Sequence, residues 1–232
     1  MKPLAVITGV GPGTGSALVR RFHAGGYRVA MLARTADRLA ELEREAPGAF
    51  AVPCDVTDAN MLGGALARIE QEAGSPKVLI HNAVGGAFGS FLDIDPAVLE
   101  RNFQVNVMAL LHLARWATPS MEAAGEGALI VTGNTSALRG RARFAGFAPT
   151  KAAQRILAES IAREMGPKGV HVAFLMIDAV IDLAWTRARY PEQPDDFFIK
   201  PADIADEAWH LAHQPRSAWS FLTEVRPFKE TW

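Results

Sequence analysis

Short apolar runs alternate with longer amphipathic stretches along the whole chain. Continuous apolar runs bounded by turn-forming residues are typical of buried strands, whereas apolar positions that recur every three or four residues are typical of helices. The first pattern predicts strands at 3–8, 28–33, 49–53, 77–81, 127–132, 169–176 and 219–226. The second predicts helices at about 14–25, 36–46, 58–73, 97–123 (broken), 147–166 and 201–213.

Strands without polar interruption, such as Ala128–Val131, favour a parallel sheet that is covered on both faces. The strict alternation of strands and helices therefore predicts an α/β fold, a doubly wound, Rossmann-like parallel sheet of about seven strands with helices on both faces. We expect Thr57 to cap the helix that follows Asp55, and Gly166 and Pro167 to end the helix near Lys151. Ligands of such sheets bind at the carboxyl ends of the strands, where every motif below falls.

Composition narrows the class of protein. The 232 residues carry a formal charge of −1 and show no linker, so a single domain over 1–232 is expected. This charge gives no reason to expect nucleic-acid or anionic-membrane binding, and no apolar run reaches membrane-spanning length. The single cysteine, Cys54, excludes an intramolecular disulfide framework. Among the histidines, His210 and His213 are three residues apart on an expected exposed helix, which is not enough to predict a metal site. We expect a cytoplasmic protein without a metal, a nucleic-acid partner or a membrane partner.

A glycine-dense segment follows the first predicted strand. Gly9, Gly13 and Gly15 have the spacing G-x-x-x-G-x-G and stand where the chain leaves the strand for a helix. Glycine allows backbone N–H groups to approach a pyrophosphate, and the helix N-terminus attracts the negative charge of the phosphates. The segment therefore predicts a nucleotide site.

Preceded by Thr8, this loop resembles the cofactor loop of the short-chain dehydrogenase/reductase family, and the resemblance covers nearly the whole chain. It implies a dinucleotide cofactor. A guanidinium can pair with a ribose 2′-phosphate where a carboxylate would repel it, so Arg34 after the second strand favours NADP, with NAD as the alternative. The positions that the resemblance assigns to cofactor binding are Gly9, Gly13, Thr14, Gly15, Arg34, Asp55, Val56, Asn82, Ala83 and Lys151. Arg34 as a plain loop arginine, Asp55 as a helix cap and Asn82 as a structural side chain are the alternatives.

The resemblance also implies catalytic positions. Asn106 matches the asparagine whose backbone carbonyl holds a water on the proton relay, and Lys151 matches the lysine of the Tyr-x-x-x-Lys motif. The tyrosine position of that motif is Phe147, which can neither donate nor accept a proton. The two tyrosines of the chain, Tyr27 and Tyr190, do not fit the motif.

The position of the family's serine is ambiguous. Counting back from Lys151 leads to Asn134, whereas counting forward along the fifth strand leads to Thr135, next to Ser136. We expect Thr135 or Ser136 to polarise the substrate carbonyl, with a plain turn as the alternative. Ile177-Asp178-Ala179 takes the place of the family's Pro-Gly after the sixth strand, so Asp178 or Asp182 is expected near the nicotinamide.

Two further segments bear on the substrate. The stretch 178–200 is rich in aromatic residues and corresponds to the substrate lid; Tyr190 within it is either a replacement acid or a packing residue. Arg139, Arg141 and Arg143 either steer an anionic substrate or belong to a solvated loop or subunit contact.

These residues predict an NAD(P)-dependent oxidoreductase that acts on a carbonyl or alcohol substrate with an atypical proton donor. The alternative is a non-catalytic NADP(H)-binding sensor or partner protein. The helix after Phe147 carries small and apolar residues on more than one face, which predicts a homodimer or homotetramer.

Overall fold

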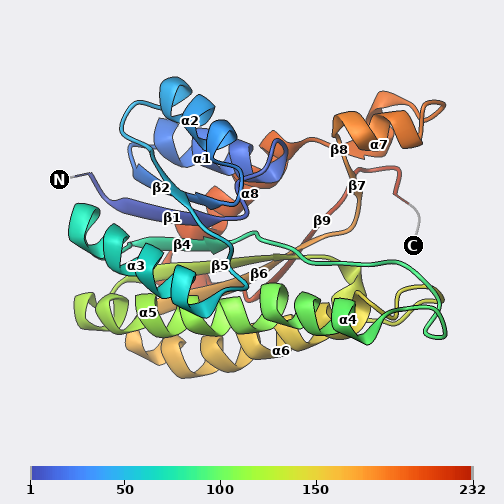
Figure 1. Cartoon of the computed structure of the whole chain (residues 1–232). Helices are drawn as coiled ribbons and strands as arrows, with labels where there is room; N and C mark the ends of the chain where they lie inside the picture. Colours follow the sequence, from blue (N-terminus) through green and yellow to red (C-terminus); the bar gives the residue numbers. More distant parts are fainter. Residues whose placement is uncertain (1, 231–232) are drawn as a thin grey trace.

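Seven parallel strands form the central sheet in the computed structural model, which describes residues 2–230 (Figure 1). Their order is β3-β2-β1-β4-β5-β6-β9, so the direction of winding reverses between β1 and β4. Such a reversal leaves a crevice at the carboxyl ends of the strands, where doubly wound sheets bind ligands. The strands are β1 (Leu4–Thr8), β2 (Arg28–Ala33), β3 (Phe50–Pro53), β4 (Val78–His81), β5 (Gly127–Gly133), β6 (Val170–Ile177) and β9 (Leu222–Val225).

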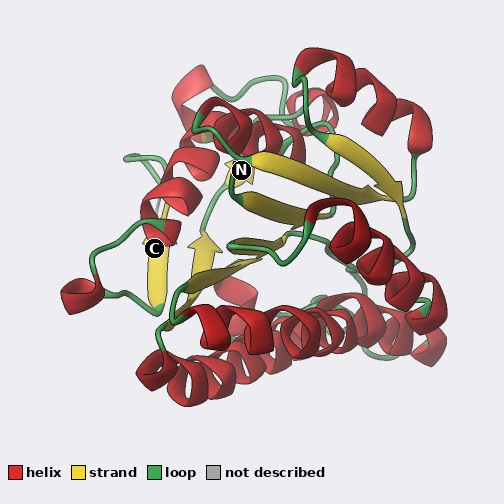
Figure 2. Ribbon diagram, turned by 90° about the vertical axis from the view of Figure 1, so that its left-hand side faces the viewer, coloured by secondary structure: helices red, strands yellow, loops and turns green. Residues whose placement is uncertain are grey.

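Helices cover both faces of the sheet, as the sequence predicted (Figures 1 and 2). One layer holds α1 (Thr14–Ala24), α2 (Ala36–Glu45) and α8 (Pro201–Ala212). The other holds α3 (Ala59–Ala73), α4 (Pro96–Phe103), α5 (Ala109–Ala124) and α6 (Ala148–Met165).

Alternating residues of each strand enter different cores. In β1, Val6 belongs to the core beneath α3, α5 and α6, whereas Ala5 and Ile7 belong to the core beneath α1, α2 and α8. All five residues of β1 are buried. A strand that is buried on both faces needs apolar side chains at every position, which explains the uninterrupted apolar runs of the sequence.

The predicted strands and helices are present, with boundaries that differ by at most three residues from the predicted ones. The long fourth helix is broken as predicted: a π-helical turn, Gln104–Met108, joins α4 to α5. The predicted cap of α3 is wrong, because Asp58 rather than Thr57 accepts the N–H groups of Asn60 and Met61.

The predicted irregular stretch 178–200 contains short elements. Strands β7 (Val180–Ile181) and β8 (Phe198–Ile199) pair with each other, and helix α7 (Ala184–Arg189) lies between them. Elements this short carry no detectable hydrophobic period, so the sequence pattern could not predict them. None of the helices among residues 2–230 is long and apolar enough to cross a membrane.

Candidate functional site

The turn between β1 and α1 lies directly against the end of β4. Gly9 has a φ of 70°, and a Cβ on it would collide with the backbone nitrogen of Ala83. A Cβ on Gly15 would collide with the carbonyl oxygen of Gly9. Both positions therefore require glycine, one for backbone conformation and close approach and the other for close approach alone.

The N-terminus of α1 offers donors to an anion. Its N-cap is Gly13, which provides no side-chain cap, and the buried hydroxyl of Thr14 has no hydrogen-bond partner among residues 2–230. An orphaned buried hydroxyl beside a positive helix end fits a ligand that carries a phosphate oxygen. The turn therefore fits the pyrophosphate of a dinucleotide.

A chain of hydrogen bonds joins this turn to Lys151. The Asn82 amide donates to the Gly9 carbonyl at 2.9 Å, and the Thr132 hydroxyl donates to Asn82 Oδ1 at 3.1 Å. The Lys151 ammonium donates in turn to the Thr132 carbonyl at 3.1 Å. Gly9, Asn82 and Lys151, which are far apart in the sequence, thus lie in one continuous network at the carboxyl ends of β1, β4 and β5.

Arg34 and Asp55 follow the neighbouring strands β2 and β3. Asp55 Oδ1 accepts the backbone N–H of Thr57 at 3.0 Å and its hydroxyl at 2.9 Å. These bonds, the backbone one foremost, hold the pKa of Asp55 below its ordinary value, and the nearby Arg34 guanidinium lowers it further. Arg34 is exposed, and Val56, the next residue after Asp55, is half-buried.

The sequence reasoning missed His81, a fully buried residue at the end of β4. Its Nε2 donates to the Val105 carbonyl at 3.1 Å, so its Nδ1 is the acceptor of the Thr8 hydroxyl at 3.0 Å. Burial lowers the pKa of His81 to about 3, which keeps the ring neutral. The only signal in the sequence is a histidine that ends an otherwise apolar strand.

Asn106 lies in the π-helical turn, and its side chain is fully engaged by the protein. Its amide donates to the Gly85 carbonyl at 2.7 Å and to the Thr150 hydroxyl at 2.8 Å, while its Oδ1 accepts the Gly85 N–H. The side chain thus holds the loop after β4 against α6.

Lys151 projects from α6 into a fully buried environment. Besides the Thr132 carbonyl, its ammonium donates to Oε1 of Gln154, a second residue that the sequence reasoning missed. Desolvation lowers the pKa of Lys151 to about 7, because burial penalises the charged form. Gln154 stands three residues after Lys151 on the same helix, so the two side chains lie on one helix face.

The ring of Phe147, one helical turn before Lys151, is buried at the start of α6. It lies 5.5 Å from the ring of Phe88, and a Cβ on Gly86 would approach its Cδ2 to 2.7 Å. The ring thus fills the space beneath the loop that follows β4.

The turn after β5 holds the three candidate residues for carbonyl polarisation. The Thr135 hydroxyl donates to Asp178 at 3.0 Å, which occupies its proton. Asn134 Oδ1 accepts the Ser136 N–H at 3.1 Å, and the amide nitrogen of Asn134 has no hydrogen-bond partner among residues 2–230. The Ser136 hydroxyl likewise has no hydrogen-bond partner in that part of the chain.

An ion-pair network closes the 178–200 stretch. Asp182 accepts from Arg187 at 2.6 Å and from Lys200 at 2.8 Å, and both cations also bind Asp195. These bonds hold the pKa of Asp182 well below its ordinary range. Leu183 lies over the glycine turn, where a Cβ on Gly13 would collide with it.

Tyr190 packs within this stretch, with its ring 5.9 Å from that of Phe197. Tyr27 lies elsewhere, in an aromatic cluster with Phe22 and Trp209. The Tyr27 hydroxyl bonds His213 and the Tyr190 hydroxyl bonds Arg189, so within residues 2–230 neither hydroxyl contacts Lys151, Asn134 or Ser136.

Comparison with known proteins identifies the family. Residues 3–182 match the family described as short chain dehydrogenase. The chain belongs to the short-chain dehydrogenase family.

Relatives and solved structures of this family cover most of the chain. It is 27% identical over 227 residues to a 7alpha-hydroxysteroid dehydrogenase of Escherichia coli, covering 93% of this chain and 88% of the relative. It is 32% identical to a D-erythrulose reductase of Gallus gallus, covering 72% and 67%. A metagenomic short-chain oxidoreductase solved in complex with NADP is 28% identical, with a TM-score of 0.84 and 97% of each chain covered.

The site of this short-chain dehydrogenase has two ends. At the first, which we call the nucleotide end, hydrogen bonds join Gly9 of the glycine turn to Asn82 and Thr132 and onward to Lys151. At the second, which we call the substrate end, lie Phe147, just before α6, and Asn134, in the turn after β5. The family resemblance leads us to expect the family's tyrosine at position 147 and, counting back from Lys151, its serine at position 134.

Proposed function

We propose that this short-chain dehydrogenase binds NADP(H) and interconverts a carbonyl compound and an alcohol with an atypical proton donor. The observation that carries the proposal is the hydrogen-bonded network from Gly9 through Asn82 and Thr132 to Lys151. It joins a turn that fits a pyrophosphate to the lysine of the catalytic motif. The NADP complex of the metagenomic relative supports the cofactor.

The cofactor would lie along the carboxyl ends of the strands. Its pyrophosphate would meet Gly13, Thr14 and the N-terminus of α1, and its 2′-phosphate would meet the exposed Arg34. Asp55 and Val56 would flank the adenine. Asn82, Ala83 and Lys151 would face the nicotinamide ribose. When bound, the nicotinamide supplies or accepts the hydride at the carbonyl carbon.

The protein must then stabilise and protonate the substrate oxygen without a tyrosine. Asn134 and Ser136 each have a donor that no other group among residues 2–230 uses, so they would hydrogen-bond the developing alkoxide. Thr135 is less suitable because its proton is given to Asp178. The proton itself would come from the Lys151 ammonium through a water, since a pKa of about 7 suits a general acid at neutral pH.

A turnover assay tests this proposal. NADPH and NADP⁺ consumption is followed at high enzyme concentration over aldehydes, ketones and secondary alcohols, with wild type, Lys151→Met and the exposed control Lys168→Met. Turnover that Lys151→Met abolishes and Lys168→Met leaves unchanged supports an oxidoreductase. Tight NADPH binding without any turnover contradicts it.

That second outcome favours a non-catalytic NADP(H)-binding sensor or partner protein. The observation that supports this alternative is the phenyl ring of Phe147. The ring lacks the hydroxyl of the family's acid, and it is buried and packed at the start of α6. The two functions share the cofactor and differ in turnover.

We also propose a homodimer or homotetramer that pairs through α6. Ile156 is 51% exposed on this helix, an apolar side chain that a second copy would cover. Sedimentation at micromolar concentration tests the assembly, and Ile156→Glu is expected to shift it towards the 25.0 kDa monomer. A wild-type monomer contradicts the proposal.

A further inference from the structure

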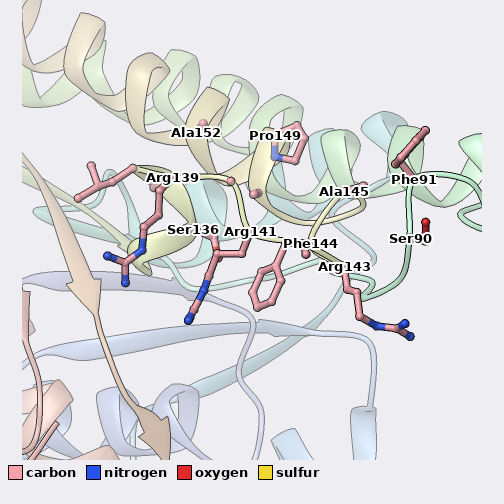
Figure 3. Close-up of a pocket in the computed structure, with 15 residues that line it drawn as sticks. Ser90, Phe91, Ser136, Arg139, Arg141, Arg143, Phe144, Ala145, Pro149 and Ala152 are labelled. Carbon is pink, nitrogen blue, oxygen red and sulfur yellow. The ribbon is translucent and has the colours of Figure 1, made fainter. Parts of the chain in front are cut away.

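A cavity of about 770 Å³ opens beside the turn that holds Asn134 and Ser136. Its walls come from the loop 136–145, the first turn of α6 and the loop after β4 (Figure 3). Ser136 is one of its lining residues, so the cavity adjoins the place where the substrate oxygen would be held.

Three arginines line this cavity, and no acidic residue does. Arg139, Arg141 and Arg143 are exposed, and none of them forms an ion pair within residues 2–230. Arg139 and Arg141 project from the loop in the same direction, while Arg143 leaves on the other side of the Phe144 ring (Figure 3). In a chain with a formal charge of −1, this is a local concentration of positive charge rather than a general basic character.

The backbone at Arg143 adds an independent observation. Its φ of 66° makes it the sole non-glycine residue with a positive φ in the described chain. The Gly89 N–H donates to the Arg143 carbonyl at 2.8 Å, which fixes this conformation. A glycine at position 143 would adopt this φ without steric cost, whereas an arginine adopts it at a conformational cost. The shape of the turn therefore does not call for an arginine side chain at this position.

Apart from Ser90 and Ser136, the remaining wall residues are apolar or glycine, and they include the side chains of Phe91, Leu138, Phe144 and Pro149. Ala148, the first residue of α6, also lines the cavity, but the N–H groups of this first turn are taken up by the Phe144 and Phe147 carbonyls. The positive charge of the cavity therefore comes from the arginines. The cavity combines three cationic side chains with mostly apolar walls and the Ser136 side chain.

We propose that this cavity binds the anionic end of the substrate, a carboxylate or a phosphate carried on a short apolar chain. The inference rests on the proposed function, because it places the reacting carbonyl of the same molecule beside Asn134 and Ser136. Arg139 and Arg141 form the planar donor pair for the anion, and Arg143 supports it from the opposite side of Phe144.

Binding of simple probes tests the cavity without any turnover. Hexanoate, hexyl phosphate and hexanol, which share one apolar chain, are titrated calorimetrically into the protein without cofactor. Wild type is compared with Arg139→Gln/Arg141→Gln and with Arg44→Gln/Arg115→Gln, which removes two exposed arginines elsewhere. We expect an anionic probe to bind wild type and the control at least ten-fold more tightly than the cavity variant, and hexanol to bind all three equally weakly. The stronger of the two anions identifies the group.

Equal binding of both anions to all three proteins would overturn the inference. A second variant separates binding from folding: Arg143→Gly is expected to keep or raise the Tm while it weakens anion binding, and unchanged binding would exclude Arg143 from the site. A parallel NADPH titration keeps the two proposals apart. NADPH binding with no arginine-dependent anion binding overturns the cavity alone, whereas absent NADPH binding overturns the proposed function.

Discussion

The two ends of the site are built by different kinds of constraint. At the nucleotide end, Gly9 and Gly15 are required because another backbone lies where their Cβ atoms would be. At the substrate end, the chemistry depends on the side chains of Phe147, Asn134 and the arginines, and no backbone collision comparable to that at Gly9 constrains them. Backbone packing therefore fixes which residues can stand at the nucleotide end, whereas the substrate end depends on the functional groups of individual side chains.

The consequence is that chemistry can change at one end without disturbing the fold. A tyrosine and a phenylalanine at position 147 differ by one oxygen, and the observed ring packs against Phe88 and the backbone at Gly86. A methyl group at Gly9, in contrast, would meet the backbone of Ala83. A phenylalanine in place of a tyrosine at position 147 thus removes a reactive hydroxyl but changes the packing less than a methyl group at Gly9 would.

The largest effect is expected for Gly9→Ala. The combination of a φ of 70° and a backbone collision should lower the free energy of unfolding by about 3 kcal/mol or more and abolish NADPH binding. Urea denaturation and an NADPH titration measure both. Gly11→Ala is the matched control, since a Cβ there meets nothing within 4 Å, and it should stay within about 0.5 kcal/mol of wild type. Equal effects of the two substitutions would contradict the steric account.

The next effect is a gain at the other end. Phe147→Tyr restores a hydroxyl one turn before Lys151, whose charge favours its ionised form, and should raise kcat/KM on simple ketones by about 10²-fold. The same substitution combined with Lys151→Ala should lose the gain, and Phe228→Tyr, at an exposed ring, should show none. No gain at position 147 would mean that the reaction uses a different part of the site.

The contrast between backbone packing and individual side-chain contacts also explains which parts of the fold and site the sequence could predict. Apolar period and glycine spacing predicted the sheet, its helices and the turn that fits a pyrophosphate, because packing dictates these patterns. His81 was missed because its partner Thr8 is 73 residues away, and no local pattern reports such a contact. Gln154 was missed because polar residues are common on helices, and the sequence alone does not show that the Lys151 ammonium donates to this one.

The loop 134–145 was the least predictable part of the site. Counting along the sequence left Asn134, Thr135 and Ser136 as alternatives, because a one-residue difference in a turn changes which side chain faces the substrate. Only the bond from Thr135 to Asp178 and the bond from Ser136 to Asn134 distinguish them. Such bonds depend on the three-dimensional path of the turn.

A smaller effect is expected at Arg34, where side-chain chemistry enters the nucleotide end. Arg34→Asp should weaken NADPH binding roughly 10- to 100-fold, as for the loss of a charge-assisted bond, and should weaken NADH binding much less. Arg44→Asp, on the following helix, makes the same change in charge and should leave the ratio of the two affinities unaltered. If NADH binds wild type more tightly than NADPH, Arg34 does not hold a 2′-phosphate.

The last effect concerns pH; it is spread over several pH units and separates the two ends of the site through their buried bases, Lys151 and His81. The pKa of Lys151 is about 7 in the folded protein, below its ordinary value of 10.5, so the unfolded chain binds more protons between these values. Stability without cofactor should therefore rise with pH across this window, by at most about 1.4 kcal/mol per pH unit, because the proton-binding difference is at most one. His81, at the nucleotide end, acts in the same direction but only between its pKa of about 3 and its ordinary 6.5.

Urea denaturation at a series of pH values distinguishes the two contributions. Lys151→Met removes the buried base of the substrate end, so its stability should change less than that of wild type between pH 7 and pH 10 while the profile below pH 6.5 stays the same. Lys168→Met, at an exposed lysine paired with Glu122, should reproduce the wild-type profile. Parallel profiles for Lys151→Met and wild type above pH 7 would show that the ammonium stays charged in the folded protein. Lys151 would then be a much weaker acid at neutral pH than its proposed role requires, and the proton would have to come from another group.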